Sequence, residues 1–401
     1  MTLFWPGDHL AGGTFSETHL LEAVVAAEAA WLAVLVDARI APTAARADLE
    51  GLIGPADLPR LAVDAATGGN PVIPVVALLR ESLAVRGDTD AARWLHRGLT
   101  SQDVLDTALI VMAVDVWVDL RIHLRRVVDT LATLADAHRT SRMVGRTLTQ
   151  PAVPITFGAK VAGWLHGVLD AVDQLDQLEF PAQCGGAAGT LSGVTVLTGG
   201  DGRAALTLAA AFADRLLLVP AAPWHTHRTP VTRFGEAVAR CTAACGRIAN
   251  DVLTLNRPEI GELGESAGGG SSTMPQKANP TRSVSIRRAA LSAPAHLSLL
   301  HLAAADTRDE RPDGAWHAEW QPLHLLARHA LTAVVQTRDL VDGLRVDTFR
   351  MAENLAAAAD VDAEAQALGD LLGSVPAWAG ADDALIDAAV ARAAAWQETD
   401  A

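Results

Sequence analysis

Tyrosine is absent from this chain of 401 residues, and phenylalanine occurs only seven times. Half of the residues are nevertheless hydrophobic, mostly Ala, Leu and Val, so the chain can bury a large core without many aromatic rings. β-Sandwiches depend on aromatic and β-branched side chains, whereas Ala and Leu favour helices. We therefore predict an all-α protein whose helices pack closely through small side chains.

Cysteine is also scarce, since the chain contains only Cys184, Cys241 and Cys245. Three cysteines are too few for a disulfide framework, and the odd number indicates reduced thiols. Cys241 and Cys245 lie one helical turn apart in an apolar segment, which favours buried side chains over metal ligands.

Basic residues are outnumbered, with 32 Lys and Arg against 47 Asp and Glu, a net charge of −15. Such a surface repels nucleic acid and anionic lipid, although it leaves room for a basic pocket that binds an anionic substrate. The N-terminus lacks a basic region followed by an apolar one, and Glu22 and Glu28 interrupt the apolar stretch 20–35. We therefore expect a cytoplasmic protein with no nucleic acid partner and no membrane span.

Helical periodicity dominates what remains, and only 193–197 has the composition of a strand. Ser16 is placed to cap the first helix, and Thr100 or Ser101 the fourth. The helices expected from the pattern are 17–39, 43–53, 75–86, 101–139, 154–179, 202–215, 230–256, 281–304, 317–341, 347–371 and 382–397.

The long helices predict a central bundle with a smaller helical domain at each end of the chain. The expected domains are 1–108, 109–330 and 331–401.

Three polar segments interrupt the helices: patch 1 (residues 96–103), patch 2 (residues 145–151) and a glycine-rich loop (residues 268–280). Their hydroxyl and amide groups, together with the single lysine Lys277, are groups that bind carboxylates. A long glycine-rich loop inside a helical chain is more often functional than not. The sequence contains no Walker, dinucleotide-binding or H-E-x-x-H motif.

Residues 270–280, Gly-Ser-Ser-Thr-Met-Pro-Gln-Lys-Ala-Asn-Pro, resemble the signature loop G-S-S-x-M-P-x-K-x-N-P of the fumarase/aspartase superfamily. An eleven-residue match with fixed spacing is highly specific. Within the superfamily, the chain is most similar to the 3-carboxy-cis,cis-muconate cycloisomerases, and the similarity extends from about residue 14 to 325. The supporting segments are 69–74, 96–107, 185–190, 223–226 and 314–320.

The resemblance implies a homotetramer in which each active site is built from three chains, and a small di- or tricarboxylate substrate. It implies no metal and no organic cofactor. Reactions of the superfamily add or remove a group β to a carboxylate, through a carbanion that fixed donors stabilise.

By resemblance, Ser271 transfers the proton at carbon, while Lys277 and Asn279 hold the activated carboxylate. His96 either lines the site or orients patch 1, and Arg228 either binds a carboxylate or has a structural role. The residues expected to bind substrate are His96, Thr100, Ser101, Gln102, Thr147, Gln150, Arg228, Ser272 and Met274.

Patch 2 departs from the superfamily pattern at Leu148 and Pro151, where many members carry a histidine that acts as general acid. Lactonisation has less need of such an acid, because its leaving group is a stable carboxylate. We therefore expect a lactonising 3-carboxy-cis,cis-muconate cycloisomerase of the β-ketoadipate pathway. The alternatives are a lyase that releases fumarate from a substituted succinate, and a non-catalytic structural protein on the same scaffold.

The variant Ser271→Ala is expected to abolish turnover while leaving assembly intact, because the change removes only one hydroxyl group. Substrate consumption and size-exclusion chromatography of the variant measure the two properties. An active Ser271→Ala enzyme would refute the role given to Ser271.

Overall fold

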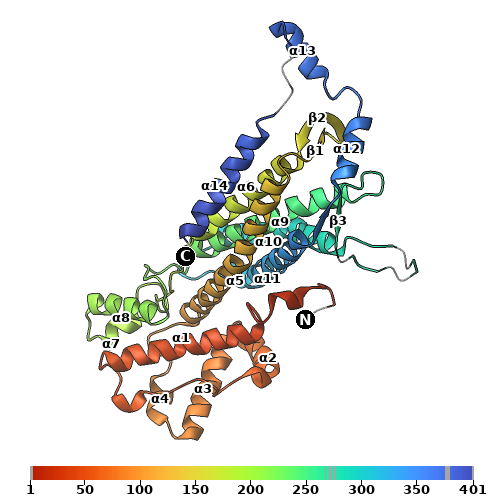
Figure 1. Ribbon diagram of the computed structural model, residues 1–401. Coiled ribbons are helices and arrows are strands. Elements are labelled where there is room, and N and C mark those ends of the chain that lie inside the picture. The colour runs from red at the N-terminus through yellow and green to blue at the C-terminus, as the bar shows by residue number, and fades with distance from the viewer. Residues whose placement is uncertain (1–2, 267, 271–272, 275–276, 375–379, 400–401) are drawn as a thin grey trace.

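A computed structural model of the chain describes residues 3–266, 268–270, 273–274, 277–374 and 380–399. Five long helices pack side by side as a bundle (Figure 1), and the all-α prediction is confirmed. These helices are α5 (Ser101–Ala137), α6 (Phe157–Asp176), α9 (Thr229–Leu255), α10 (Thr281–Ala305) and α11 (Ala315–Asp342).

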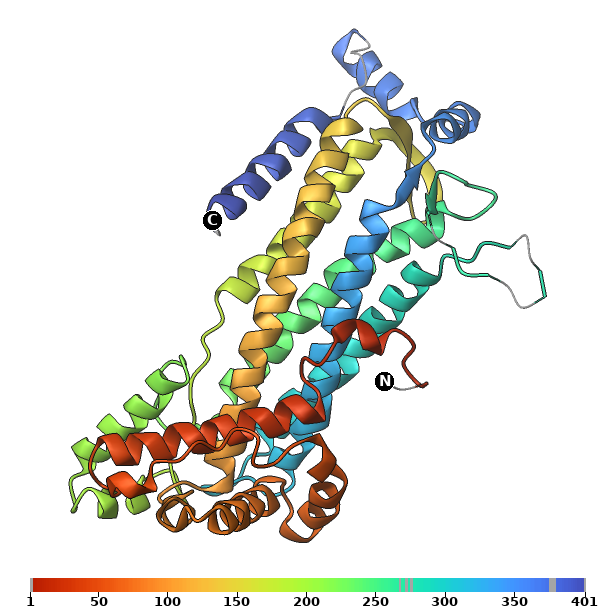
Figure 2. The same cartoon turned by 60° about the horizontal axis from the view of Figure 1, so that its bottom comes forward.

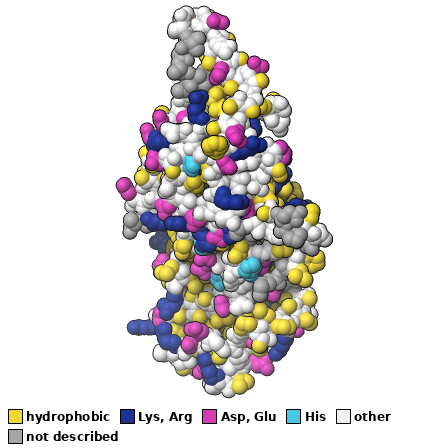
Figure 3. Space-filling model, turned by 45° about the vertical axis from the view of Figure 1, so that its right-hand side comes forward, with side chains coloured by type: hydrophobic (Ala, Val, Ile, Leu, Met, Phe, Trp, Pro, Cys, Tyr) yellow, Lys and Arg dark blue, Asp and Glu magenta, His cyan; other side chains and the backbone are white. Residues whose placement is uncertain are grey.

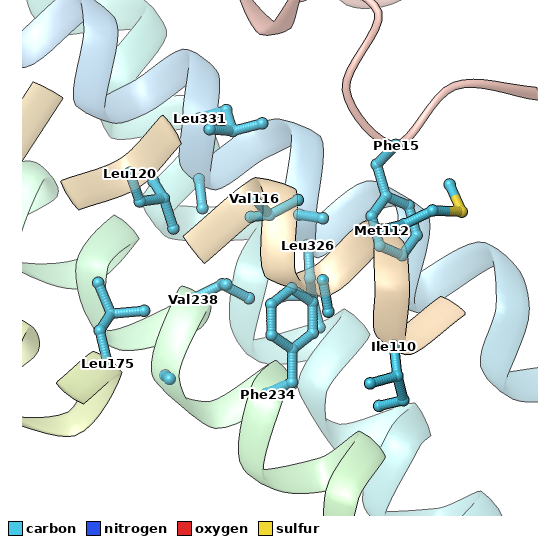
Figure 4. Packing of buried hydrophobic residues seen from close by; sticks show 14 of the residues in the cluster. Phe15, Ile110, Met112, Val116, Leu120, Leu175, Phe234, Val238, Leu326 and Leu331 are labelled. Carbon is cyan, nitrogen blue, oxygen red and sulfur yellow. The ribbon is translucent and has the colours of Figure 1, made fainter. Parts of the chain in front are cut away.

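The core of the bundle is built from aliphatic side chains and from small residues that let helices approach closely. Phe234 of α9 lies beside Val116 of α5 and Leu326 of α11 (Figure 4). A Cβ atom at Gly246 of α9 would overlap the side chain of Ala290 in α10. Close packing therefore depends on small residues at the α9–α10 contact, as the composition predicted.

At one end of the bundle, α1 (Glu17–Asp37) packs against α5 and is surrounded by shorter helices (Figure 2). Ser16 caps α1, because its Oγ accepts a hydrogen bond of 3.2 Å from the backbone N–H of His19. The shorter helices are α2 (Leu58–Gly68), α3 (Val72–Arg86), α4 (Thr89–Trp94), α7 (Ser192–Leu197) and α8 (Gly202–Arg215).

Helix α1 is the one helix in the described part of the chain that is long and apolar enough to cross a membrane. The expectation that Glu22 and Glu28 rule out such a span on composition is therefore wrong. However, 61% of the apolar window of α1 is already buried inside the protein. The core helix of a globular protein is long and apolar in the same way.

At the other end of the bundle, α12 (Thr348–Ala357) and α13 (Ala363–Leu372) project outward (Figures 1 and 2). Helix α14 (Asp382–Thr399) returns to pack against α5 and α6. The single helix expected at 347–371 is wrong, because Asp360, between α12 and α13, has a φ of +56° that no α-helix accommodates.

Two small antiparallel sheets correct the prediction that the chain has no strand apart from 193–197. The first pairs β1 (Arg142–Thr147) with β2 (Gln150–Thr156), and the second pairs β3 (Leu263–Glu265) with β4 (Leu344–Val346). Patch 2 is thus the tip of a hairpin and not a loop. The helix expected from 154 begins at Phe157, because Pro154 fits a two-stranded edge better than a helix.

Two further expectations are wrong, and two helices were not predicted. The region 43–53 contains only a 3₁₀ turn, Thr43–Ala45, because Gly51 and Gly54 follow it. The segment 193–197 is helical and lies in α7, since a short β-branched run does not by itself specify a strand. Helices α2 and α4 were not expected.

The boundaries expected at 108/109 and 330/331 fall inside α5 and α11. Both helices continue through these positions without a break, and the proposed division into three domains stays a prediction.

Candidate active site

Patch 1 surrounds the start of α5, where Asp103 organises the neighbouring backbone. Its carboxylate accepts hydrogen bonds from the N–H groups of Thr100 (2.9 Å), Gly185 (2.7 Å) and Gly186 (2.9 Å). The same carboxylate lies 2.8 Å from Nε2 of His225. Asp103 therefore caps its helix and holds the small-residue loop 183–190 against it.

Gln102 lies in the interior of this cluster and not on its surface. Its side chain is fully buried, and Nε2 donates a 3.0 Å hydrogen bond to the carbonyl of His225. Its Oε1 has no hydrogen-bond partner among the described residues. In the isolated chain, Gln102 links α5 to the segment 223–228, while Thr100 and Ser101 remain partly exposed.

Arg311 provides patch 1 with a cation that the sequence analysis did not select. Its Nη2 donates hydrogen bonds to the hydroxyl of Thr100 and to the carbonyl of Ala187 (3.1 Å). In the sequence, Arg311 sits in the charged run 308–313 and resembles ordinary surface. The one signal in the sequence that could have identified Arg311 is its position directly before 314–320, a segment that resembles the cycloisomerases. Thr100, Ser101 and Arg311 together form a set suited to a carboxylate.

Arg228 is enclosed between two carboxylates. It donates to Glu319 (2.7 to 3.1 Å) and to Asp106 (2.7 and 3.0 Å), and more weakly to the carbonyl of Trp224 (3.4 Å). All five N–H groups of the guanidinium are thereby engaged, and its side chain has no exposed surface. Burial raises the pKa of the Glu319 carboxyl, and the hydrogen bond from Arg228 opposes that rise. Of the two roles left open by the sequence, this environment favours the structural one.

His96 is tied to α1 by a second carboxylate. Its Nδ1 lies 2.6 Å from Oε1 of Glu28, whose side chain is fully buried, while 18% of the His96 side chain is exposed. The backbone of His96 is left-handed, with a φ of +62°. His96 therefore lies in the connection that leads into patch 1, held by a residue 68 positions earlier.

Patch 2 forms the tip of the β1–β2 hairpin, where Thr147 pairs with Gln150. The two turn residues, Leu148 and Thr149, have φ values of +49° and +71°. All four side chains are exposed, and Leu148 is 96% exposed. None of the four can donate a proton near neutral pH.

The hairpin is anchored by Arg146, which makes a bidentate contact with Glu262 at 2.7 and 3.1 Å. Asn354 of α12 donates to the same carboxylate at 2.8 Å. The tip therefore projects from a fixed base.

The glycine-rich loop leaves the bundle through a short paired neck. Gly269 and Asn279 exchange two backbone hydrogen bonds of 2.8 and 2.9 Å, and the Asn279 side chain donates to the carbonyl of Gly270 at 3.2 Å. A Cβ at Gly269 would overlap Thr281, so the neck requires glycine there. Glu265 fixes the following helix by accepting hydrogen bonds from the N–H and hydroxyl of Ser283 at 2.8 and 2.7 Å.

Beyond the neck, Met274 and Lys277 have exposed side chains. The residues expected to transfer the proton and to bind beside it, Ser271 and Ser272, lie outside the described residues.

The three segments do not meet within one chain. Patch 1 begins α5 and patch 2 follows its end, and the 37 residues of this helix at 1.5 Å each span about 55 Å. Figure 1 accordingly places them at opposite ends of the bundle, with the glycine-rich loop nearer to the hairpin. Cavities of about 830, 780 and 410 Å³ lie among the described residues, but Thr100, Thr147 and Lys277 line none of these three.

On the face in Figure 3, acidic and basic side chains are interspersed. Within the described ranges, no group of three or more His, Cys, Asp or Glu side chains is arranged to hold a metal ion.

Residues 59–293 match a family model described as lyase. The chain is 42% identical over 355 residues to the nitrosuccinate lyase of Streptomyces davaonensis. The aligned region covers 84% of this chain and 74% of that protein. It is 39% identical over 302 residues to a 3-carboxy-cis,cis-muconate cycloisomerase of Pseudomonas aeruginosa, covering 74% of this chain and 64% of that protein. This structure superimposes on the crystal structure of the 3-carboxy-cis,cis-muconate lactonizing enzyme of Pseudomonas putida with a TM-score of 0.82 and 32% sequence identity. The superposition covers 96% of this chain and 86% of that enzyme.

The variant Arg228→Met is expected to lower the free energy of unfolding by about 3–5 kcal/mol, because it leaves Asp106 and Glu319 buried without their counter-charge. Denaturant unfolding measures the change. Arg233→Met, the same substitution at an exposed position of α9, serves as control and should change stability by less than about 0.5 kcal/mol. A stable Arg228→Met protein with a raised KM would instead show that Arg228 binds substrate.

Proposed function

Because the chain belongs to the lyase family of the fumarase/aspartase superfamily, we propose that it breaks or forms a bond β to a carboxylate by proton transfer at carbon. It is an enzyme of this superfamily, whose members act on small carboxylate substrates. The carboxylate-binding character of Thr100, Ser101 and Arg311 supports the proposal, as does the presence of Lys277 and Asn279 in the signature loop.

The proposed chemistry places three demands on the site. A base removes the proton next to the carboxylate, fixed donors stabilise the carbanion, and a further group stabilises the leaving group. We assign the first task to Ser271 and the second to Lys277 and Asn279. The exposed side chain of Lys277 supports this assignment, because it is available to a substrate held on another chain.

The residues at the hairpin tip indicate what kind of leaving group the site can release. Thr147, Leu148, Thr149 and Gln150 offer hydroxyl, amide and apolar groups but no proton donor of suitable strength. Patch 2 would then bind the substrate without protonating what leaves. This favours a leaving group that is stable as an oxyanion, such as nitrite or a carboxylate.

Our first candidate is elimination of nitrite from a nitro-substituted succinate, with fumarate as the other product. The 42% identity to a nitrosuccinate lyase over 84% of this chain favours it. We therefore favour elimination over lactonisation, whereas the sequence motifs favoured lactonisation.

The second candidate is interconversion of 3-carboxy-cis,cis-muconate and its lactone. It is favoured by the segments that resemble cycloisomerases and by the superposition on the lactonizing enzyme. In this reaction the departing oxygen belongs to a carboxylate of the same molecule, so the demand on the hairpin tip is unchanged.

A shared site in a homotetramer is also part of the proposal. Patches 1 and 2 follow from opposite ends of α5, a helix about 55 Å long, so we infer that they contribute to one site from different chains. An exposed apolar stripe on α10 supports such an assembly, since its members lie on one face of the helix and remain exposed by 41–71%. These residues are Val284, Leu291, Leu299 and Leu302.

A two-substrate assay decides between the candidates. With nitrosuccinate we expect equal amounts of nitrite and fumarate, and with 3-carboxymuconate we expect no loss of diene absorbance. The opposite pattern would establish the cycloisomerase. Inactivity towards both compounds, in a protein shown to be assembled, would overturn the proposed function and favour the structural alternative.

Mixed tetramers test the shared site. Ser271→Ala and Ser101→Ala chains are each expected to be inactive alone. After coexpression, a site takes its loop and patch 1 from different chains, so about one-quarter of sites (one-half times one-half) regain both serines. Activity recovered to that extent in mixed tetramers identified by mass spectrometry would support the proposal. No recovery would place the complete site within one chain, and coexpression of two copies of one variant is the control.

A further inference from the structure

Glu28 is a buried carboxylate in the middle of an otherwise apolar stretch of α1. Its side chain has no exposed surface, its Oε1 contacts Nδ1 of His96 at 2.6 Å, and its Oε2 has no hydrogen-bond partner among the described residues. Arg80 interacts with Glu28 electrostatically, but its Nη2 donates to the carbonyl of Leu95 at 2.8 Å. A half-satisfied buried charge costs stability relative to an apolar side chain, so its presence here needs a reason other than folding.

His96 is held rigidly by the connection on either side of it. The carbonyl of Arg97 accepts a 2.7 Å hydrogen bond from Nε1 of Trp31. Gly98, with a φ of +89°, is packed closely against Val194. The left-handed backbone of His96, at +62°, is costly for a residue with a side chain and persists because these contacts fix it. The imidazole is therefore presented in one orientation.

The geometry of this pair differs from that of His225, a buried imidazole that also contacts a carboxylate. The partner of His225, Asp103, already accepts three backbone hydrogen bonds, and the side chain of His225 is only 2% exposed. Glu28 has no such backbone donors among its hydrogen bonds in the described structure, and His96 keeps 18% of its side chain exposed. Among the described residues, His96 is thus the one hydrogen-bond partner of the Glu28 carboxylate, and the ring edge opposite Glu28 is left for another partner.

We propose that His96 donates a hydrogen bond from Nε2 to the leaving group as it departs, with Glu28 as the positioning residue. The inference rests on the proposed function and supplies the donor that the hairpin tip lacks. With a proton on each ring nitrogen, the imidazolium pairs its charge with Glu28 and directs its Nε2–H away from α1. His96 precedes Thr100 by four residues, which places this donor at the edge of patch 1.

In elimination, the base takes the proton from carbon, and the C–H electron pair forms the double bond. The bond from the neighbouring carbon to the leaving group breaks, and its electron pair leaves with nitrite or, in lactone opening, with the carboxylate. His96 keeps its proton and stabilises the negative charge that develops on the oxygen atoms of the leaving group. No further reactant is required.

Kinetics of the assembled enzyme test the proposal with the variants His96→Gln, Glu28→Gln and the double variant. We expect kcat to fall about 100-fold for His96→Gln and at least about 10-fold for Glu28→Gln, with KM changed less than about threefold. Because Glu28 acts through His96, the double variant should be no slower than His96→Gln. The variant His9→Gln, at an exposed imidazole, should retain full activity.

Thermal unfolding separates this role from a structural one. Glu28→Gln removes a half-satisfied buried charge, so its Tm should equal or exceed that of the unmodified protein while kcat falls. A structural ion pair predicts the reverse, a lower Tm with unchanged kcat, and that result would overturn the proposal.

Two kinetic results would also overturn the role proposed for His96, and only the second would overturn the proposed function as well. An active enzyme with an undiminished His96→Gln variant would eliminate the donor role while the proposed function remained. An unmodified protein inactive towards both substrates would remove the proposed function together with the step in which His96 acts.

Discussion

The length and rigidity of α5 constrain everything else in this structure. The helix extends for 37 residues without a proline or a glycine, a length of about 55 Å, and patch 1 and the β1–β2 hairpin lie at its opposite ends. Each chain therefore presents the parts of a site at separate places. The exposed apolar stripe on α10 is a surface through which copies of the chain could associate and bring those parts together.

Around patch 1, buried charge has two distinct uses. The Asp106–Arg228–Glu319 cluster is fully paired, and Asp103 has four hydrogen-bond partners, so both act as internal scaffolding that fixes the start of α5. Glu28 is different because one of its oxygens is unsatisfied. The carboxylates of Asp103, Asp106 and Glu319 have hydrogen-bond partners on both oxygens, and this difference distinguishes Glu28 from the other buried carboxylates around patch 1.

Sequence reasoning succeeded where the determining interactions are local. Ser16 caps α1 through a residue three positions away, and the helix after Pro280 begins within one residue of its expected start. It failed at the hairpin, where the strands of patch 2 depend on pairing and not on composition. Among the candidate residues, the Glu28–His96 contact joins positions 68 apart, and Arg311 reaches Thr100 across 211 positions. No periodicity could reveal either contact, because both exist only after the helices have packed.

The distribution of charge among the three segments limits the chemistry that an assembled site can perform. The tip of patch 2 contributes only neutral groups, the glycine-rich loop contributes Lys277, and patch 1 contributes Arg311 and the paired His96. Positive charge therefore comes from two sides, while the neutral hairpin tip with its exposed Leu148 offers an apolar wall. A substrate that carries two carboxylates and releases a third negative group suits this arrangement, because each anionic part finds a donor and none needs a strong acid. The hairpin tip itself offers no acid that could protonate an amine leaving group.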